Sequence, residues 1–289
     1  MVKKLLKYEF KARAPMLLLM WGIIIAVACA ARILAIIVYH APETENPAVS
    51  TIIGIVSIFH TSSVAMLVIG CIAMVVITMV LNVVRFYKNL YSAEGYLSFT
   101  LPVSRKQHIF AKTFVSFVMT AGGILVCFIA GLINTDFESL RAMLEQTGLN
   151  TLIDAFVAEC GTVNCVLYII EAVLVIVAFI LCGIMKYNAC LSIGQLARRR
   201  KILLSFGVYA GLYFARQFIS TVFVAILMPL TLFNNNFNGF IERINEWFEG
   251  NSAAGFHIIL CVNLAIYVIG FVLFSIATYL PMKKKLNLE

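Results

Sequence analysis

The chain has 289 residues, of which 62% are hydrophobic and only 12% are charged, and its mean hydropathy is +0.97. A soluble domain is about 45–50% apolar, so this composition excludes an ordinary soluble protein and predicts an all-α integral membrane protein. The net charge of +8 is spread around the apolar runs and forms no single patch, which argues against nucleic-acid binding.

Residues 1–14 are predicted to form a cytoplasmic interfacial helix. At 100° per residue, lysines and aliphatic residues of Val2–Arg13 lie on opposite faces: Lys3, Lys4, Lys7 and Lys11 against Val2, Leu5 and Leu6. Glu9 and Arg13 lie on the apolar side, but their i,i+4 spacing allows them to pair. Pro15 is expected to separate this helix from the first span. A simple topology signal is the alternative interpretation.

Residues 15–289 are predicted to form one transmembrane domain with six spans. Each is an apolar run of about 20 residues, the length that crosses a hydrocarbon core: Met16–Tyr39, Ser62–Val84, Ile109–Ile133, Cys165–Met185, Ile202–Met228 and Phe256–Leu280. The apolar stretch Thr51–Val84 exceeds one crossing, so its start should lie outside the core or tilt steeply.

The basic residues predict the orientation. All Lys and Arg flank the spans on one side except Arg32, Arg141, Arg216 and Arg243. By the positive-inside rule that side is cytoplasmic. We therefore expect a multi-pass protein of the bacterial plasma membrane with both termini in the cytoplasm.

The opposite connections, residues 40–61, 134–164 and 229–255, are predicted to contain short amphipathic helices. In Asn238–Gly250, aromatic and aliphatic residues recur at helical spacing, and Gly250 suits the C-terminal end. Its polar face carries mostly Glu, so this helix is not expected to depend on anionic lipid. It could rest at the outer interface or enter the membrane beside the last spans.

Residues 134–164 contain two further signals. Thr135–Glu138 has the spacing of a capping box, which would begin a short helix that Gly148 should end. Cys160 and Cys165 are close enough to pair on the outer side, and the sequence leaves a disulfide between them open.

The connection 85–108 is basic and aromatic, although it separates two apolar runs. Ser92 can cap a short helix that continues through Phe99, and Pro102 limits it. Ser104–Gln107 has the spacing of a second capping box, which would begin the third span. The short helix could be a turn with aromatic residues at the membrane interface, or a docking helix whose apolar anchors fit a groove in a partner.

Three segments resemble the small six-span permease subunits of type-2 ATP-binding-cassette (ABC) exporters. They are KYEFKARAPML (7–17), RFYKNLYSAEGYLSFTLPVSRKQ (85–107) and SIGQLARRRK (192–201). The resemblance implies an elbow helix before the first span, a coupling helix in the second-to-third connection, and outer helices between the fifth and sixth spans. Candidates for all three are present at Val2–Arg13, Ser92–Phe99 and Asn238–Gly250.

The resemblance also implies a function and partners. The chain would be a non-catalytic permease that moves an amphipathic substrate, such as a peptide or lipid. Five residues would bind the ATPase at the coupling helix: Ser92, Glu94, Tyr96, Leu97 and Phe99. The sequence contains no Gly-x4-Gly-Lys-Ser/Thr loop, so a separate ATPase subunit would bind ATP and Mg²⁺, and this chain would carry no cofactor.

Such permeases act as homodimers or with a related permease. Gly207 and Gly211 form a GxxxG pair that permits close helix contact. Family members use the first and fifth spans at the dimer interface, which favours a role for this pair there. Packing within one chain explains the pair equally well.

With Lys112 counted among the basic residues of the second-to-third connection, three ionisable residues remain inside spans: Arg32, Glu171 and Arg216. Such residues usually face a bundle interior or water and have a partner. Our hypothesis is that Arg32 and Glu171 pair near the outer end and that Arg216 faces a translocation path. A purely structural salt bridge, or an exposed Glu171, are the alternatives. The four histidines are too scattered to predict a metal site, and no catalytic residues are predicted.

A self-sufficient secondary transporter or channel is the alternative function. It would ideally show inverted hydropathy repeats, Gly- or Pro-broken spans or acidic relays at mid-depth, whereas the one firm mid-depth charge here is an Arg, Arg216. An intramembrane enzyme would need paired acids with a metal-binding His or a Gly-x-Ser-x-Gly motif within the spans, and neither occurs.

Overall fold

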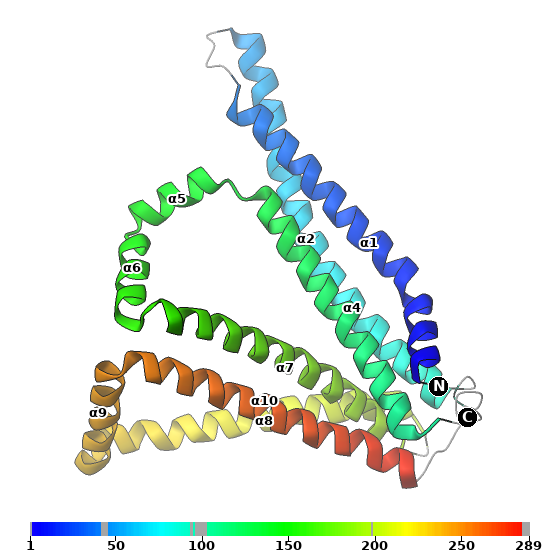
Figure 1. The fold of residues 1–289 in the computed structure, drawn as a ribbon. Helices are drawn as coiled ribbons and strands as arrows, with labels where there is room; N and C mark the ends of the chain where they lie inside the picture. Colours follow the sequence, from blue (N-terminus) through cyan, green and yellow to red (C-terminus); the bar gives the residue numbers. More distant parts are fainter. Residues whose placement is uncertain (1, 42–45, 93–94, 96–102, 198, 285–289) are drawn as a thin grey trace. The chain divides into compact units, whose positions relative to one another are not determined.

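The computed structural model describes residues 2–41, 46–92, 95, 103–197 and 199–284, and every regular element in these ranges is a helix (Figure 1). The helices are α1 Val2–Tyr39, α2 Pro47–Tyr91, α4 Arg105–Asn134, α5 Phe137–Gln146, α6 Leu149–Cys160, α7 Thr162–Gly194, α8 Lys201–Phe233, α9 Asn235–Gly250 and α10 Ser252–Lys284. Six of them (α1, α2, α4, α7, α8 and α10) are long and apolar enough to cross a membrane. Each of the six predicted spans lies inside one of these helices, so this part of the prediction is confirmed.

Several of these helices are longer than a bilayer requires. At 1.5 Å per residue, the 45 residues of α2 extend about 67 Å, whereas a hydrocarbon core is about 30 Å thick. Part of α2 must therefore lie outside the core or the helix must tilt. The same helix continues past the predicted span end at Val84 to Tyr91, so it carries the first residues of the 85–108 connection.

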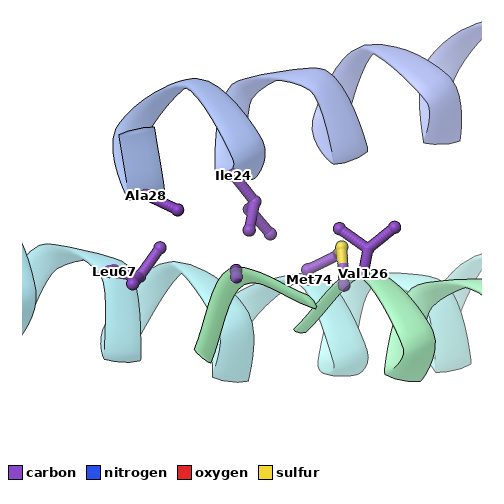
Figure 2. Close-up of a cluster of buried hydrophobic side chains, with 6 residues drawn as sticks. Ile24, Ala28, Leu67, Met74 and Val126 are labelled. Atoms are coloured by element: carbon purple, nitrogen blue, oxygen red, sulfur yellow. The ribbon is translucent and has the colours of Figure 1, made fainter. Parts of the chain in front are cut away.

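The chain forms two compact units. The first comprises residues 1–88 and 99–144, in which α1, α2 and α4 pack side by side (Figure 1). Ile24 and Ala28 of α1 face Leu67 and Met74 of α2, with Val126 of α4 beside them (Figure 2). These buried aliphatic side chains form the centre of the three-helix unit.

Close packing of α1 on α4 depends on a glycine. A Cβ atom added to Gly122 would lie 2.5 Å from Cη2 and 3.0 Å from Cζ2 of the Trp21 indole ring. We expect Gly122→Ala to lower the free energy of unfolding by about 1–3 kcal/mol, because overpacking forces side chains and backbone to shift. Gly131→Ala is the matched control, since no atom lies within 4 Å of a Cβ added there on the same helix. Thermal unfolding in detergent should separate the two variants, and equal midpoints would contradict the prediction.

The predicted break at Pro15 is wrong, because α1 runs without interruption from Val2 to Tyr39 with Pro15 inside it. Proline removes one backbone hydrogen bond and normally kinks or ends a helix. Here the residues on both sides are held by packing: Leu17 is buried, and Phe10 and Ala14 lie against the same cluster as Leu17. Tertiary contacts therefore carry the helix through the proline.

One capping box is confirmed and the other is wrong. The Ser104 hydroxyl accepts from the Gln107 amide at 3.4 Å, and the Gln107 side chain accepts from the Ser104 amide at 3.0 Å, at the start of α4. Thr135 instead ends α4, and its hydroxyl donates to the Gly131 carbonyl. The short helix α5 does follow, from Phe137, and Gly148 lies beyond its end with φ +68°.

The second unit comprises residues 89–98 and 145–289. In it α7 packs against α10 and α8, and α9 joins the end of α8 to the start of α10 (Figure 1). Aromatic rings of α6, α7 and α10 meet at one end, where Phe156 lies against Phe256 with 5.1 Å between ring centroids and Tyr168 lies 5.9 Å from Phe256. Cys160 and Cys165 are both free thiols in the structure, so the disulfide left open by the sequence is not formed.

The helix predicted at Asn238–Gly250 is confirmed as α9, which begins three residues earlier; its position on the outer side stays a prediction. Its N-terminus is capped by the Asn234 side chain, which accepts from the amides of Asn236 and Phe237. An Asn at this position supplies an acceptor for amides that lack a partner within the helix. The amphipathic sequence and its local cap together define this helix.

Candidate functional site

The first unit contains a cluster of buried polar side chains where α1, α2 and α4 meet. We call it the N-terminal polar cluster, and its members are Glu9, Arg13, Asn82, Lys112, Ser116 and Thr120. Glu9 is 6% exposed, Arg13 3% and Lys112 2%. Ionised side chains are almost never this deeply buried unless they are paired, so the contacts within the cluster account for its position.

Arg13 is the centre of the cluster. One terminal nitrogen of its guanidinium donates to Asn82 Oδ1 at 2.9 Å and to Ser116 Oγ at 2.8 Å. The other donates to Glu9 Oε2 at 3.2 Å. A single side chain of α1 is therefore bonded to both α2 and α4.

Glu9 and Asn82 extend the network. The second carboxylate oxygen of Glu9 accepts from Lys112 Nζ, so one carboxylate lies between two cations. The Asn82 amide donates to Thr120 Oγ1 at 3.1 Å, and that hydroxyl donates to the Ser116 carbonyl. The i,i+4 pairing of Glu9 with Arg13 expected from the sequence is confirmed, but its environment is a buried helix junction.

Arg85 connects this region to the 85–108 connection. Its guanidinium donates to the backbone carbonyl of Ala12 on α1. Arg85 and Ala12 belong to two of the three segments that carry the resemblance. This hydrogen bond therefore joins the first of these segments to the second.

The second unit contains a buried hydrogen bond between a side chain of α2 and one of α7. The hydroxyl of Tyr91, the last residue of α2, donates to Ser192 Oγ at 2.7 Å, and Ser192 donates to the Asn188 carbonyl. Tyr91 is 4% exposed and Ser192 is fully buried. Tyr91 lies in the second resembling segment and Ser192 in the third, so this contact joins those two.

The turn after Ser192 is tightly packed. A Cβ atom added to Gly194, the last residue of α7, would lie 2.8 Å from the Cα of Ser205 on α8. Only a residue without a side chain fits between these two backbones. Gly194 therefore fixes how closely α7 and α8 approach each other at this end.

The predicted ATPase-binding residues are only partly described. Ser92 is half-buried and directly follows α2, and the Gly95 amide donates to its carbonyl at 2.7 Å. Glu94, Tyr96, Leu97 and Phe99 lie outside the described residues. The coupling helix at Ser92–Phe99 thus stays a prediction.

The predicted intramembrane charges lie in both units. Arg32 is half-buried on α1 in the first unit, and Glu171 is on α7 in the second. Their pairing stays a prediction. Within the second unit, both carboxylate oxygens of Glu171 lie 2.9 Å from Nδ1 of His257 on α10, and the His257 ring lies 4.5 Å from the Tyr168 ring. Arg216 is exposed on α8.

The two glycines predicted at a dimer interface have empty space beside them. No described atom lies within 4 Å of a Cβ added to Gly207 or Gly211, and both residues are exposed on α8. Packing of another described helix onto these glycines, the alternative left by the sequence, is not observed. Their use at a dimer interface stays a prediction.

The interhelical hydrogen bonding expected of Asn82 from the sequence is confirmed, since it bonds to α1 and α4. Sequence reasoning missed Lys112, Tyr91 and Ser192 as members of buried polar contacts. One signal for Lys112 was available: it lies three residues into the apolar run that begins at Ile109, where a lone Lys needs a partner. The buried Glu9, which the helical wheel places on the apolar side, was a matching signal. No local pattern indicates Tyr91 and Ser192, which are 101 positions apart.

Comparison with protein-family models, curated proteins and solved structures finds no match to this chain. The class of the chain is therefore given by its six helices that are long and apolar enough to cross a membrane. The chain is a multi-pass membrane protein whose described regular elements are all helices, with buried polar contacts on both flanks of its 85–108 connection.

Proposed function

We propose that this chain is the transmembrane permease subunit of an ABC exporter. It moves an amphipathic substrate, such as a peptide or lipid, using ATP that a separate ATPase subunit hydrolyses. It works in a bacterial plasma membrane, with both termini in the cytoplasm, as a homodimer or with a related permease. In this proposal the chain is not an enzyme and binds neither ATP nor Mg²⁺.

The observation that carries the proposal is the pair of hydrogen bonds made by the end of α2. Arg85 donates to Ala12, and Tyr91 donates to Ser192. The three segments that resemble the permease family lie far apart in sequence, and these two bonds connect them. Such contacts fit a function in which force on the second segment must reach the other two.

The N-terminal polar cluster supports a mechanical role for this region. Its members on α2 and α4 precede and follow the proposed coupling helix at Ser92–Phe99 in the sequence, and Arg13 bonds them to α1. Closure of the ATPase would push on the coupling helix, and the bonded ends of α1, α2 and α4 would move together. The spans would then shift between inward- and outward-facing states. In this arrangement Val2–Arg13 serves as the elbow, although these residues are the first part of the uninterrupted helix α1.

The open surface of α8 supports pairing with a second permease. Gly207 and Gly211 leave room for a close helix contact, as a GxxxG pair does in membranes. Arg216 is exposed on the same helix, and a charge within a span needs a partner or water. A second permease, or a water-filled path at the interface, would provide one.

The test is co-purification from the cells that produce the protein. Residues 92–99 are replaced by eight Gly and Ser residues in a tagged chain, and a control chain carries the same replacement at residues 40–47, at the opposite end of α2. We expect an ATPase with a Walker motif to co-purify with the wild-type chain and the control, and to be absent with the 92–99 replacement. All three proteins must be present in the membrane fraction at similar levels.

Two outcomes would contradict the proposal. Retention of the ATPase after replacement of residues 92–99 would place the docking site elsewhere. Absence of any ATPase with the wild-type chain would instead favour a self-sufficient secondary transporter or channel.

A further inference from the structure

The second unit has a hollow of about 440 Å³ between α9 and the start of α10, which none of the functions considered above uses. It is lined by Phe240, Arg243, Ile244, Trp247, Phe248 and Ile258. The lining is apolar and aromatic except for one guanidinium. It lies where two membrane-compatible helices, α8 and α10, are joined by an amphipathic one.

The wall of the hollow on α9 follows from helical spacing. The lining residues of α9 occur at i, i+3, i+4, i+7 and i+8 from Phe240, which places them along one side of the helix. The acidic residues Glu242, Glu246 and Glu249 fall on the other side. Phe248 packs so closely against the Cα of Gly255 on α10 that no Cβ atom would fit there, and this contact holds α9 against α10.

Arg243 is the polar group of the lining. Its Nε donates to the Gly239 carbonyl of its own helix at 3.1 Å. Its terminal nitrogens have no hydrogen bond or ion pair in the described part of the chain, even though two glutamates lie within one turn. Phe240 is 54% exposed and Trp247 44%, so large apolar surfaces and an available guanidinium border the same space.

We propose that this hollow binds a phospholipid of the surrounding bilayer, with the phosphate at Arg243 and the first part of an acyl chain along Phe240 and Trp247. A guanidinium matches the geometry of phosphate oxygens, and Trp commonly lies at the level of lipid headgroups. The phosphate is present in zwitterionic lipids too, so the glutamates on the far side of α9 do not oppose binding. The proposal does not depend on the transport function.

The experiment uses Trp247 as the reporter. The chain contains only two tryptophans, so Trp21→Phe leaves Trp247 as the single one, and this variant is the parent for all others. The purified parent in maltoside micelles is titrated with phosphatidylcholine brominated on its acyl chains, and separately with diacylglycerol carrying the same brominated chains but no phosphate. We expect the phospholipid to quench Trp247 at a concentration about 3–10-fold lower than the diacylglycerol, a difference of up to about 1.4 kcal/mol.

Two variants assign this preference to Arg243. In Arg243→Gln the two probes should quench at similar concentrations. Arg141→Gln removes a basic residue from α5, outside the hollow, and should keep the preference of the parent. Far-UV circular dichroism confirms that each variant retains its helices. Equal quenching by the two probes in the parent, an unchanged preference in Arg243→Gln, or no saturable quenching by either probe would overturn the proposal, and the last result would point to a protein partner in the hollow.

Discussion

Replacing Glu9 with Gln should lower the free energy of unfolding of the first unit by about 3–5 kcal/mol, the range for breaking a buried ion pair by removing one partner. Glu9 is the carboxylate that both Arg13 and Lys112 contact, and all three residues are at least 94% buried. Its neutralisation leaves two buried cations without their counter-ion. Water cannot reach them without opening the junction of α1, α2 and α4.

The measurement is chemical unfolding in detergent micelles, followed by Trp21 fluorescence in a Trp247→Phe background. Trp21 packs in the apolar clusters of the first unit, so its signal reports that unit. Glu138→Gln is the control, because Glu138 is an exposed carboxylate on α5 and its loss should cost less than about 1 kcal/mol. A Glu9→Gln variant as stable as this control would show that the cluster is not held by its charges.

A second substitution tests whether Glu9→Gln loses stability because two buried cations lack a counter-ion. Adding Lys112→Met to Glu9→Gln removes one of the two uncompensated cations and keeps an unbranched apolar side chain of similar length. The double variant should therefore be more stable than Glu9→Gln alone, because an apolar residue in place of a buried ion costs little. If the two losses simply add, the residues do not interact, and the role assigned to Glu9 would be wrong.

Gly194→Ala should destabilise the second unit by about 1–3 kcal/mol, the usual cost of an added group in a well-packed site. The new Cβ would lie 2.8 Å from the Cα of Ser205 and closer still to its hydroxyl. Rotation of the Ser205 side chain would relieve only the second overlap, so the backbones of α7 and α8 must separate. The movement would also reach the neighbouring Ser192, which bonds to Tyr91.

Gly183→Ala is the matched control on the same helix, since a Cβ there has no atom within 4 Å. Ala is preferred over Gly in a helix by about 1 kcal/mol, so this variant should be as stable as the wild type or more stable. Unfolding followed by Trp247 fluorescence in the Trp21→Phe background compares the two. Equal stability of Gly194→Ala and Gly183→Ala would show that α7 and α8 separate at little cost.

Features set by neighbours in sequence were predicted well. Apolar run length fixes which segments can cross a membrane, because a helix satisfies its own backbone hydrogen bonds and needs only sufficient length. The Ser104 capping box and the amphipathic helix α9 depend on side chains within one or two turns, so their spacing was enough to predict them. The Glu9–Arg13 pair is local in the same sense.

Other features depended on residues that the sequence does not place together. The α1 helix continues through Pro15 because residues on both sides pack against α2 and α4, a contribution that outweighs the local preference for a break. The capping box at Thr135 was lost to a local contact instead. The Thr135 hydroxyl bonds to the Gly131 carbonyl at the end of α4, so it does not begin the next helix.

The sequence by itself thus determined the membrane class, the six apolar helices and the helix α9, because these follow from composition and local spacing. Only the tertiary structure decided which polar groups of different helices meet. Lys112 reaches Glu9 across 103 positions, Tyr91 reaches Ser192 across 101, and His257 reaches Glu171 across 86. Within a long apolar helix many positions could carry a polar residue, and the helix-to-helix register that selects its partner comes from packing of the whole unit.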